Sequence, residues 1–167
     1  MSDSKHIAIS IAEQSLKLFD GDRCIHSYTV STGLNGVGEK QDSFCTPRGR
    51  HVIAEKIGDG CAINTIFVGR RPTGEIYSPD LRQSHPDRDW ILTRILWLEG
   101  TEDGRNRGGD VDSRNRYIYI HGSPDDAVMG APGSRGCIRM RNADVIELFD
   151  AVEAGTGVNI HEPETGR

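Results

Sequence analysis

A histidine and a cysteine in the second half of the chain have the side-chain types and surroundings that nucleophilic catalysis requires. His121 ends an apolar run, Tyr-Ile-Tyr-Ile, whose alternation predicts a strand, and Gly-Ser-Pro follows it. Cys137 stands in the sequence Ser-Arg-Gly-Cys-Ile-Arg-Met at 134–140, which predicts a tight glycine-flanked turn. A thiol becomes an effective nucleophile when a base within hydrogen-bond reach removes its proton and is itself held in place. A strand end that faces a turn supplies this pairing, so we predict an active site here.

The residues around Cys137 favour a reactive thiol. Gly136 lets a substrate carbonyl approach the backbone, so the N–H groups of Gly136 and Cys137 are predicted to stabilise a tetrahedral oxyanion. The positive charges of Arg135 and Arg139 are expected to favour the thiolate over the thiol. The alternative is that a free cysteine is a small buried hydrophobic residue. We expect that ordinary role for the other three cysteines, Cys24, Cys45 and Cys61.

The spacing of the cysteines and histidines does not fit a metal site. The sequence contains no Cys-x-x-Cys, His-x-x-x-His or Cys-x-x-His. Its acidic residues between 99 and 116 lack calcium-loop spacing, and its glycines between 32 and 50 lack the Gly-Lys-Ser/Thr of a phosphate-binding loop. We therefore expect no metal ion and no cofactor. The remaining histidines are expected at the surface or at strand edges: His6, His26, His51, His85 and His161.

The composition argues against nucleic-acid and membrane partners. The formal net charge of −5 lacks the basic excess of a protein that binds a phosphate backbone. The first residues, up to Ala12, contain no continuous apolar stretch as long as a secretory signal or a membrane span needs. This predicts a cytoplasmic protein with free thiols, or a periplasmic one if a leader was removed. The length predicts one domain, 1–167, with a core from about 7 to 161.

Strands and one helix are expected to position the two catalytic side chains. Alternation over 117–120 predicts a strand on which Tyr117, Tyr119 and His121 share one face, while Ile118 and Ile120 share the other. After the cysteine, Asn142 is predicted to cap a helix that extends to Gly155. Other strands are expected at 7–12, 16–18, 24–31, 51–57, 62–68, 90–98 and 158–161, with a tight turn at Asp20-Gly21-Asp22. The segments 32–50 and 70–89 are expected to be connections, and 99–116 a solvated loop or, alternatively, a lid over the site.

The segments His-Gly-Ser-Pro at 121–124 and Ser-Arg-Gly-Cys-Ile-Arg-Met at 134–140 together resemble the signature of the YkuD-type L,D-transpeptidase catalytic domain. Further stretches resemble other parts of this family in the same order, at 11–16, 31–33, 46–49 and 93–98. The resemblance extends from about Ile7 to Ile160. It implies a mainly β fold, a sandwich of mixed sheets with one short helix after the catalytic cysteine.

The resemblance also implies the chemistry. Members of the family attack the carbonyl of the third residue of a peptidoglycan tetrapeptide stem, usually meso-diaminopimelate at its L-centre, and expel the terminal D-alanine. Carried over to this sequence, Cys137 is the nucleophile, His121 is its base, and the carbonyl of Gly122 orients the imidazole. Acylation of Cys137 by carbapenems is expected as well. The predicted substrate-binding residues are Arg135, Arg139, Ser134 and Tyr119.

One position departs from the family pattern, because Arg135 stands where most relatives have a histidine. A guanidinium can hold a carboxylate bidentately, so we predict that Arg135 binds the carboxylate of the leaving D-alanine. With the expected cytoplasmic location, this predicts an L,D-carboxypeptidase of murein recycling, in which water resolves the thioester. One alternative is an L,D-transpeptidase, in which an amine resolves it and forms 3-3 cross-links or wall attachments. A second alternative is a stem-peptide binding module without activity.

Overall fold

The computed structural model describes residues 4–162, so the ends of the predicted domain, 1–3 and 163–167, lie outside it. The strands are β1 (Lys5–Ser10), β2 (Ser15–Asp20), β3 (Arg23–Thr29), β4 (Gly49–Ile57), β5 (Thr65–Val68), β6 (Arg71–Ile76), β7 (Leu92–Gly100), β8 (Tyr119–Ser123), β9 (Ile138–Arg141) and β10 (Gly157–His161). The helices are α1 (Pro79–Ser84) and α2 (Asn142–Ala151), with one short 3-10 turn, η2 (Gly109–Val111).

The first three strands, all of them predicted from the sequence, form an antiparallel meander. In β1 and β2 the apolar residues alternate, and the register places Ile7 opposite Leu18 and Ile9 opposite Leu16, all four fully buried. The turn between β2 and β3 contains Gly21 at a φ of +62°, a conformation that glycine adopts without a steric penalty. The tight turn predicted at Asp20-Gly21-Asp22 is therefore confirmed, and it connects β2 and β3 as a hairpin.

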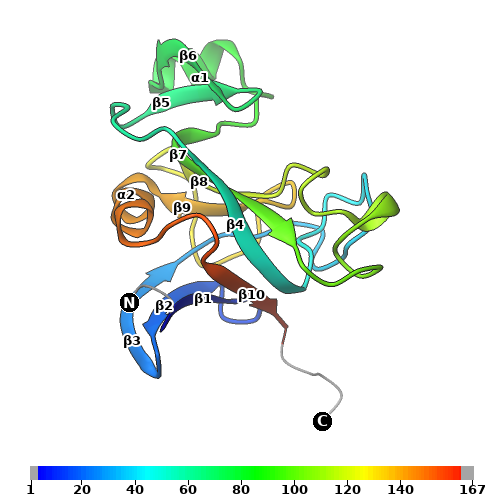
Figure 1. Ribbon diagram of the computed structural model, residues 1–167. Helices are drawn as coiled ribbons and strands as arrows, with labels where there is room; N and C mark the ends of the chain where they lie inside the picture. The colour runs from blue at the N-terminus through cyan, green and yellow to red at the C-terminus, as the bar shows by residue number, and fades with distance from the viewer. Residues whose placement is uncertain (1–3, 163–167) are drawn as a thin grey trace.

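One curled sheet of mixed direction organises the fold, in the order β3-β2-β1-β10-β4-β7-β5-β6, with β8 paired to β7 and to β9 (Figure 1). Most pairs are antiparallel, but β1 pairs in parallel with β10, and β8 pairs in parallel with β9. The meander with β10 forms one layer and β7, β8 and β9 form another, connected through the long strand β4. The predicted mainly β sandwich is confirmed, and its two layers belong to one continuous sheet.

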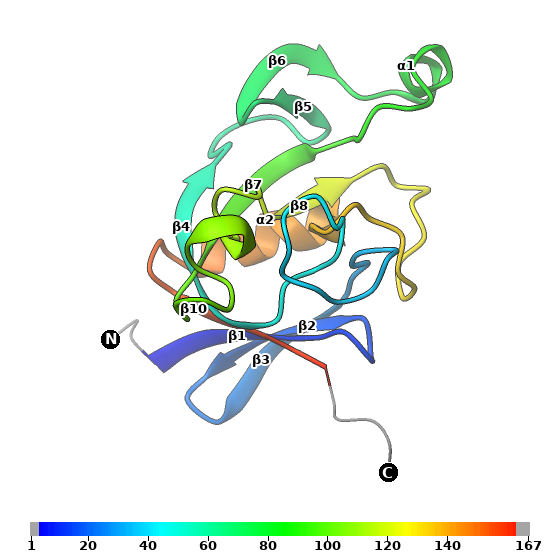
Figure 2. The same ribbon diagram turned by 90° about the vertical axis from the view of Figure 1, so that its right-hand side faces the viewer.

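Helix α2 packs between these layers against β7, β8 and β9, as Figure 2 shows. Its buried side chains Val145, Leu148 and Phe149 belong to the main core. The predicted helix is present, but Asn142 is its first residue and not its cap. Arg141 occupies the cap position without a side-chain hydrogen bond. The Asn142 side chain is instead buried and hydrogen-bonded to other segments, so it cannot bind the N–H groups of its own helix.

The connection predicted at 70–89 contains β6 and α1, which the sequence did not predict. Both elements are short. Every residue of β6 is exposed and α1 has no buried residue, so neither shows the periodic apolar pattern from which a strand or helix is predicted. Trp90, Leu92, Ile66 and Tyr77 form a small core beneath them. These elements form a separate layer at the β7 end of the sheet (Figures 1 and 2).

The polar segment 99–116 is not a fully solvated loop. Its first two residues continue β7. Asn106 is fully buried, and its Nδ2 donates to the carbonyls of Arg48 and Arg50 at 3.0 and 3.1 Å. Ser113 is fully buried as well and hydrogen-bonds His51 Nε2 at 2.8 Å. These contacts tie the segment to β4, so the alternative of a lid would require breaking buried hydrogen bonds.

Candidate active site

The parallel pairing of β8 with β9 places the predicted catalytic residues on one sheet face. Ile120 lies opposite Ile138, and both side chains are fully buried in the main core. Because side chains alternate along a strand, His121 and its register partner Arg139 face the other side of the sheet. Cys137 directly precedes Ile138, and its thiol accepts a hydrogen bond from the N–H of Tyr119 at 3.3 Å. The histidine therefore lies on β8, and the thiol lies at the start of the neighbouring strand β9.

The imidazole of His121 is 1% exposed, and its Nδ1 lies 2.7 Å from the carbonyl oxygen of Gly122. The contact predicted for this carbonyl is therefore present. A carbonyl only accepts hydrogen bonds, so the neutral ring carries its proton on Nδ1 and its lone pair on Nε2. Burial lowers the pKa of His121, the negative charge of Asp89 raises it in part, and Arg139 lowers it further. The neutral ring, which can act as a base, is thus the favoured form.

Gly122 occupies a position that no larger residue could fill. A Cβ there would meet the Asn142 side-chain oxygen and lie 2.6 Å from the carbonyl oxygen of Leu92. Opposite this glycine β7 is irregular, because Leu92 pairs with Gly122 while Ile95 pairs with His121. Thr93, between them, has a φ of +77° and donates its hydroxyl to Asn142 Oδ1 at 2.7 Å. The sequence analysis did not identify this Thr93–Asn142 support of the histidine strand.

The Cys137 thiol is half-buried and donates to the carbonyl oxygen of Tyr117 at 3.3 Å. Burial raises its pKa to about 12, which outweighs the lowering by the Tyr119 N–H and by Arg139 and Arg116. Arg139 thus favours the thiolate as expected, but burial outweighs its charge, so the neutral thiol is the favoured form in this structure. A buried anion loses more hydration than these charges restore.

Ser134 and Gly136 build the turn that carries the cysteine. The Ser134 hydroxyl is buried, donates to the Cys137 carbonyl at 2.5 Å and accepts from the Gly136 N–H at 3.1 Å. In this structure the Gly136 N–H thus has an acceptor, and the Ser134 hydroxyl holds the turn. The roles of Gly136 as oxyanion donor and of Ser134 as substrate ligand stay predictions. The positive φ of +120° at Gly136, with the Cys45 carbonyl 2.9 Å from a potential Cβ, explains why glycine is needed there.

Thr46 connects the cysteine turn to the 32–50 segment, and the sequence analysis did not single it out. Its buried hydroxyl donates to the Gly136 carbonyl at 2.8 Å and accepts from the Gly33 N–H at 2.8 Å. Backbone pairing of Ser31 with Arg139 extends this support to β9. The only sequence signal was that Thr46 begins one of the stretches that resemble the family.

The two predicted substrate-binding arginines have different surroundings. Arg135 is exposed, and its guanidinium donates to the Asp87 carbonyl oxygen at 2.9 Å. Arg139 is half-buried and lies 3.4 Å from an Asp89 carboxylate oxygen. Both thus reach the segment before Trp90, and only Arg139 faces the same way as His121.

Tyr119 is buried beneath an aromatic and arginine cluster beside the thiol. Its hydroxyl accepts from Arg70 at 3.1 Å, and its ring packs edge-on against Trp97. Arg70 also lies over the ring of Tyr117, which is half exposed. The structure contradicts the expected strand position of Tyr117, because a φ of +58° places it outside β8.

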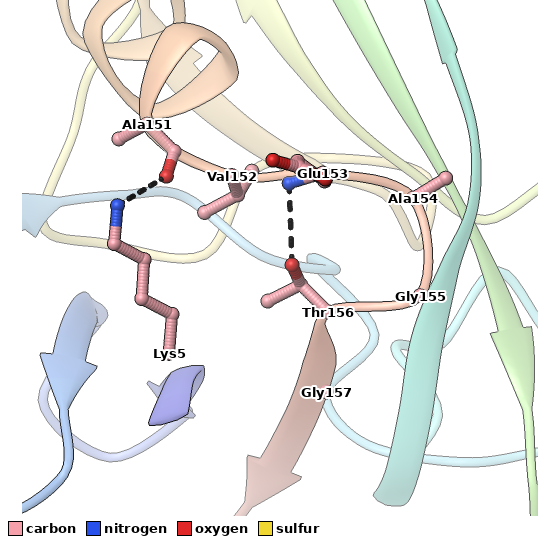
Figure 3. A pocket seen from close by; sticks show the side chains of 8 residues that line it. All are labelled: Lys5, Ala151, Val152, Glu153, Ala154, Gly155, Thr156 and Gly157. Carbon is pink, nitrogen blue, oxygen red and sulfur yellow. Dashed lines mark hydrogen bonds between the residues drawn. The ribbon is translucent and has the colours of Figure 1, made fainter. Parts of the chain in front are cut away.

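Two cavities are lined by predicted substrate-binding arginines, and another hollow lies elsewhere. A cavity of about 300 Å³ is lined by Arg139 together with residues from α1 and the segment after β8. A smaller one, about 190 Å³, is lined by Tyr117 and Arg135 among others. The hollow of about 380 Å³ in Figure 3 lies at the C-terminal end of α2. There Lys5 Nζ donates to the Ala151 carbonyl at 2.9 Å, which satisfies a helix-end acceptor.

Within residues 4–162, no cluster of three or more histidine, cysteine or acidic side chains is placed to hold a metal ion. Over the same residues, no helix is long and apolar enough to cross a membrane. All four cysteines are free. One histidine lies where it was not expected, because His51 is 2% exposed and hydrogen-bonded through both ring nitrogens, whereas a surface or edge position was predicted.

Comparison with known proteins shows the family to which the chain belongs. The family model for the YkuD L,D-transpeptidase catalytic domain matches residues 4–160. A Bacillus subtilis protein named "Putative L,D-transpeptidase YkuD" is 28% identical over 156 residues, which cover 93% of this chain and 65% of that protein. A Bacillus licheniformis protein of the same name is 27% identical, with 92% and 64% covered. The chain thus spans about two thirds of the length of these relatives.

Solved structures share the fold. L,D-transpeptidase 3 from Mycobacterium tuberculosis, in complex with a faropenem-derived adduct, superimposes with a TM-score of 0.58 at 16% identity, covering 95% of this chain and 60% of that one. An L,D-transpeptidase in complex with imipenem gives 0.57 at 18% identity, covering 95% and 59%. The chain belongs to the YkuD family of L,D-transpeptidase catalytic domains, as the sequence resemblance predicted.

Proposed function

We propose that this protein is a cysteine acyl-transfer enzyme that acts on peptidoglycan tetrapeptide stems, with Cys137 as nucleophile and His121 as base. The observation that carries the proposal is that His121 lies on β8 and Cys137 directly precedes the paired parallel strand β9, with His121 Nδ1 bound to the Gly122 carbonyl. This contact directs the basic Nε2 lone pair away from the backbone and leaves it for proton transfer. Family membership supports the same assignment.

The reaction begins from a neutral thiol and a neutral imidazole. The S–H bond of Cys137 turns from the Tyr117 carbonyl toward His121, whose Nε2 takes the proton as sulfur attacks the third-residue carbonyl. The imidazolium then returns the proton to the nitrogen of the departing D-alanine, and a thioester remains. With the Gly136 N–H engaged by Ser134, the N–H of Cys137 is the proposed oxyanion donor.

Water is the proposed acceptor, which makes the enzyme an L,D-carboxypeptidase. His121 takes a proton from water as its oxygen attacks the thioester, and the thiol leaves with that proton, releasing a tripeptide. The exposed guanidinium of Arg135, in place of the histidine of most relatives, supports a role in binding the D-alanine carboxylate. Transpeptidation, in which an amine takes the place of water, is the second candidate, and membership in a transpeptidase family favours it.

Incubation with purified disaccharide tetrapeptide, followed by mass spectrometry, separates these reactions. Loss of one alanine without dimers is expected for the hydrolase, whereas dimers joined between two third residues would establish transpeptidation. Cys137→Ala is the control for contaminating activity. A wild-type protein that converts no tetrapeptide and forms no acyl adduct would leave the stem-peptide binding module as the function.

Acylation by a carbapenem is proposed for Cys137. Its support is that a structural neighbour is an L,D-transpeptidase in complex with imipenem. Intact-mass measurement after incubation with imipenem should show one adduct on the wild type and none on Cys137→Ala. Labelling that persists in the variant would place the reactive thiol at another cysteine.

A cytoplasmic location, where soluble recycled muropeptides are the substrates, belongs to the same proposal. The four free thiols suit a reducing compartment. Fractionation of the native host with an antibody against the chain should place the protein with cytoplasmic markers. Recovery with periplasmic or extracellular markers would shift the proposal to substrates in the assembled wall.

A further inference from the structure

The cavity beside His121 is lined by three arginines, Arg82, Arg88 and Arg139, that come from separate segments of the chain. Arg82 lies on α1, Arg88 follows that helix, and Arg139 lies on β9. The remaining lining is largely apolar: Trp90, Pro124, Ala127, Val128, Pro132 and Gly133. A volume of about 300 Å³ suits a part of a peptide.

Arg82 closes one wall, and the carboxylate of Asp126 already pairs with its charge. Its guanidinium makes two hydrogen bonds to the two carboxylate oxygens of Asp126, at 2.8 and 2.5 Å. This bidentate pair connects α1 to the segment after β8, which lie on the same side of the molecule in Figure 2. The ion pair thereby connects two walls of the cavity that are far apart in the sequence.

The guanidinium groups of Arg88 and Arg139 make weaker contacts with carboxylates than that of Arg82 does. The closest carboxylate oxygen to Arg88 belongs to Glu75 and lies 3.8 Å away, longer than a hydrogen bond. The Arg88 guanidinium lies over the ring of Trp90, 4.6 Å from its centroid, which fixes the plane of the guanidinium while its N–H edges stay available. Arg139 has one long contact, 3.4 Å to Asp89. Most of the five N–H donors of each group thus remain for a ligand.

We propose that this cavity binds a carboxylate of the donor peptide through Arg88 and Arg139, and so selects stems that carry a free acid there. Because Arg139 is the register partner of His121, the cavity begins next to the proposed base. The inference rests on the proposed function. A meso-diaminopimelate stem offers two such groups, the second carboxylate of the third residue and the carboxylate of the terminal D-alanine, and both share the chemistry that a guanidinium recognises.

Binding to Cys137→Ala, measured by titration calorimetry, tests the subsite without turnover. The ligands are the tetrapeptide, the same peptide with a carboxamide at the third-residue side chain, and one with a carboxamide at its C-terminus. Arg88→Gln should weaken the unmodified tetrapeptide about tenfold or more, as expected when a charged hydrogen bond is lost. Arg88→Gln should not further weaken the binding of the peptide in which the carboxylate recognised by Arg88 is already a carboxamide. The peptide whose affinity stays unchanged therefore identifies the recognised carboxylate.

Arg23→Gln is the matched control, because Arg23 is exposed on β3 at the far end of the sheet and loses the same charge. Arg88→Lys, which keeps the charge without the fork, should give an intermediate loss and guards against a folding defect in Arg88→Gln. An equal loss for Arg23→Gln, or an equal loss for all three ligands, would overturn the subsite. Failure of the proposed function is recognised separately, as a wild type that binds but converts no tetrapeptide.

Discussion

The Nδ1 of His121 lies 2.7 Å from the carbonyl oxygen of Gly122, the next residue in the chain, and this contact fixes the tautomer of the proposed base. Replacing His121 with alanine should therefore lower kcat/KM by about two to four orders of magnitude, the range for loss of a general base. Cys137→Ala should reduce turnover at least as far. Circular dichroism should show that both variants stay folded, and near-wild-type turnover by His121→Ala would refute the assignment of the base.

The acid limb of the pH–rate profile should lie below the ordinary histidine pKa of about 6.5, because burial lowers the pKa of His121 and the ring must be neutral to act as a base. Asp89→Asn removes a negative charge that raises this pKa, so the limb should move to still lower pH. Asp87→Asn is the matched control on an exposed carboxyl. An acid limb that stays in place in Asp89→Asn would show that this charge does not act on the base.

Thr46→Val should disturb the cysteine turn while nearly preserving side-chain volume. The change removes an acceptor for the Gly33 N–H and a donor to the Gly136 carbonyl, both buried. We expect the free energy of unfolding to fall by about 1–3 kcal/mol and kcat to fall as well. Thr46→Ser keeps the hydroxyl and should restore kcat. Equal activity of the valine and serine variants would mean that the hydroxyl does not position the nucleophile.

Stability should decrease as the pH falls from about 6.5 toward 4, because burial lowers the pKa of His51 to about 4. In this window the unfolded chain binds a proton that the folded chain does not, so acid favours unfolding, by about 3 kcal/mol over the whole window. The lowered pKa of His121 acts in the same direction. Urea unfolding at several pH values should show a smaller slope for His51→Gln than for the exposed control His85→Gln.

Arg135→His restores the residue of most relatives and tests the role of this departure. Because an imidazole offers one donor geometry instead of a bidentate fork, we expect a raised KM for peptides with a free terminal carboxylate and a smaller effect on kcat. A peptide with a C-terminal carboxamide should be converted equally by both proteins. An unchanged KM for the free acid would count against Arg135 as the carboxylate ligand.

The elements that the sequence predicted well are those with a regular pattern. Ile7, Ile9, Leu16 and Leu18 alternate, and that alternation specified a hairpin with its core face. The predicted active site depended on short motifs around His121 and Cys137, and resemblance to a family was needed to combine them.

The features that could not be predicted from the sequence depend on contacts between polar groups that are far apart in the chain. Thr46 bonds Gly136, and Asn106 bonds Arg48, across intervals that carry no periodic signal. The pKa of Cys137 was expected to be low from the nearby arginines, but it depends on burial, which only the folded chain defines. Such features follow from tertiary structure rather than from local pattern.

Within residues 4–162 the last strand, β10, lies between the first strand, β1, and β4. During synthesis β1 and β4 are made long before β10, so each exposes an unpaired edge until β10 leaves the ribosome. A nascent chain that already contains both His121 and Cys137 therefore still lacks the strand that closes the sheet. We expect chains that end before Gly157 to be inactive and to bind chaperones, so that activity appears only after β10 has been made and paired.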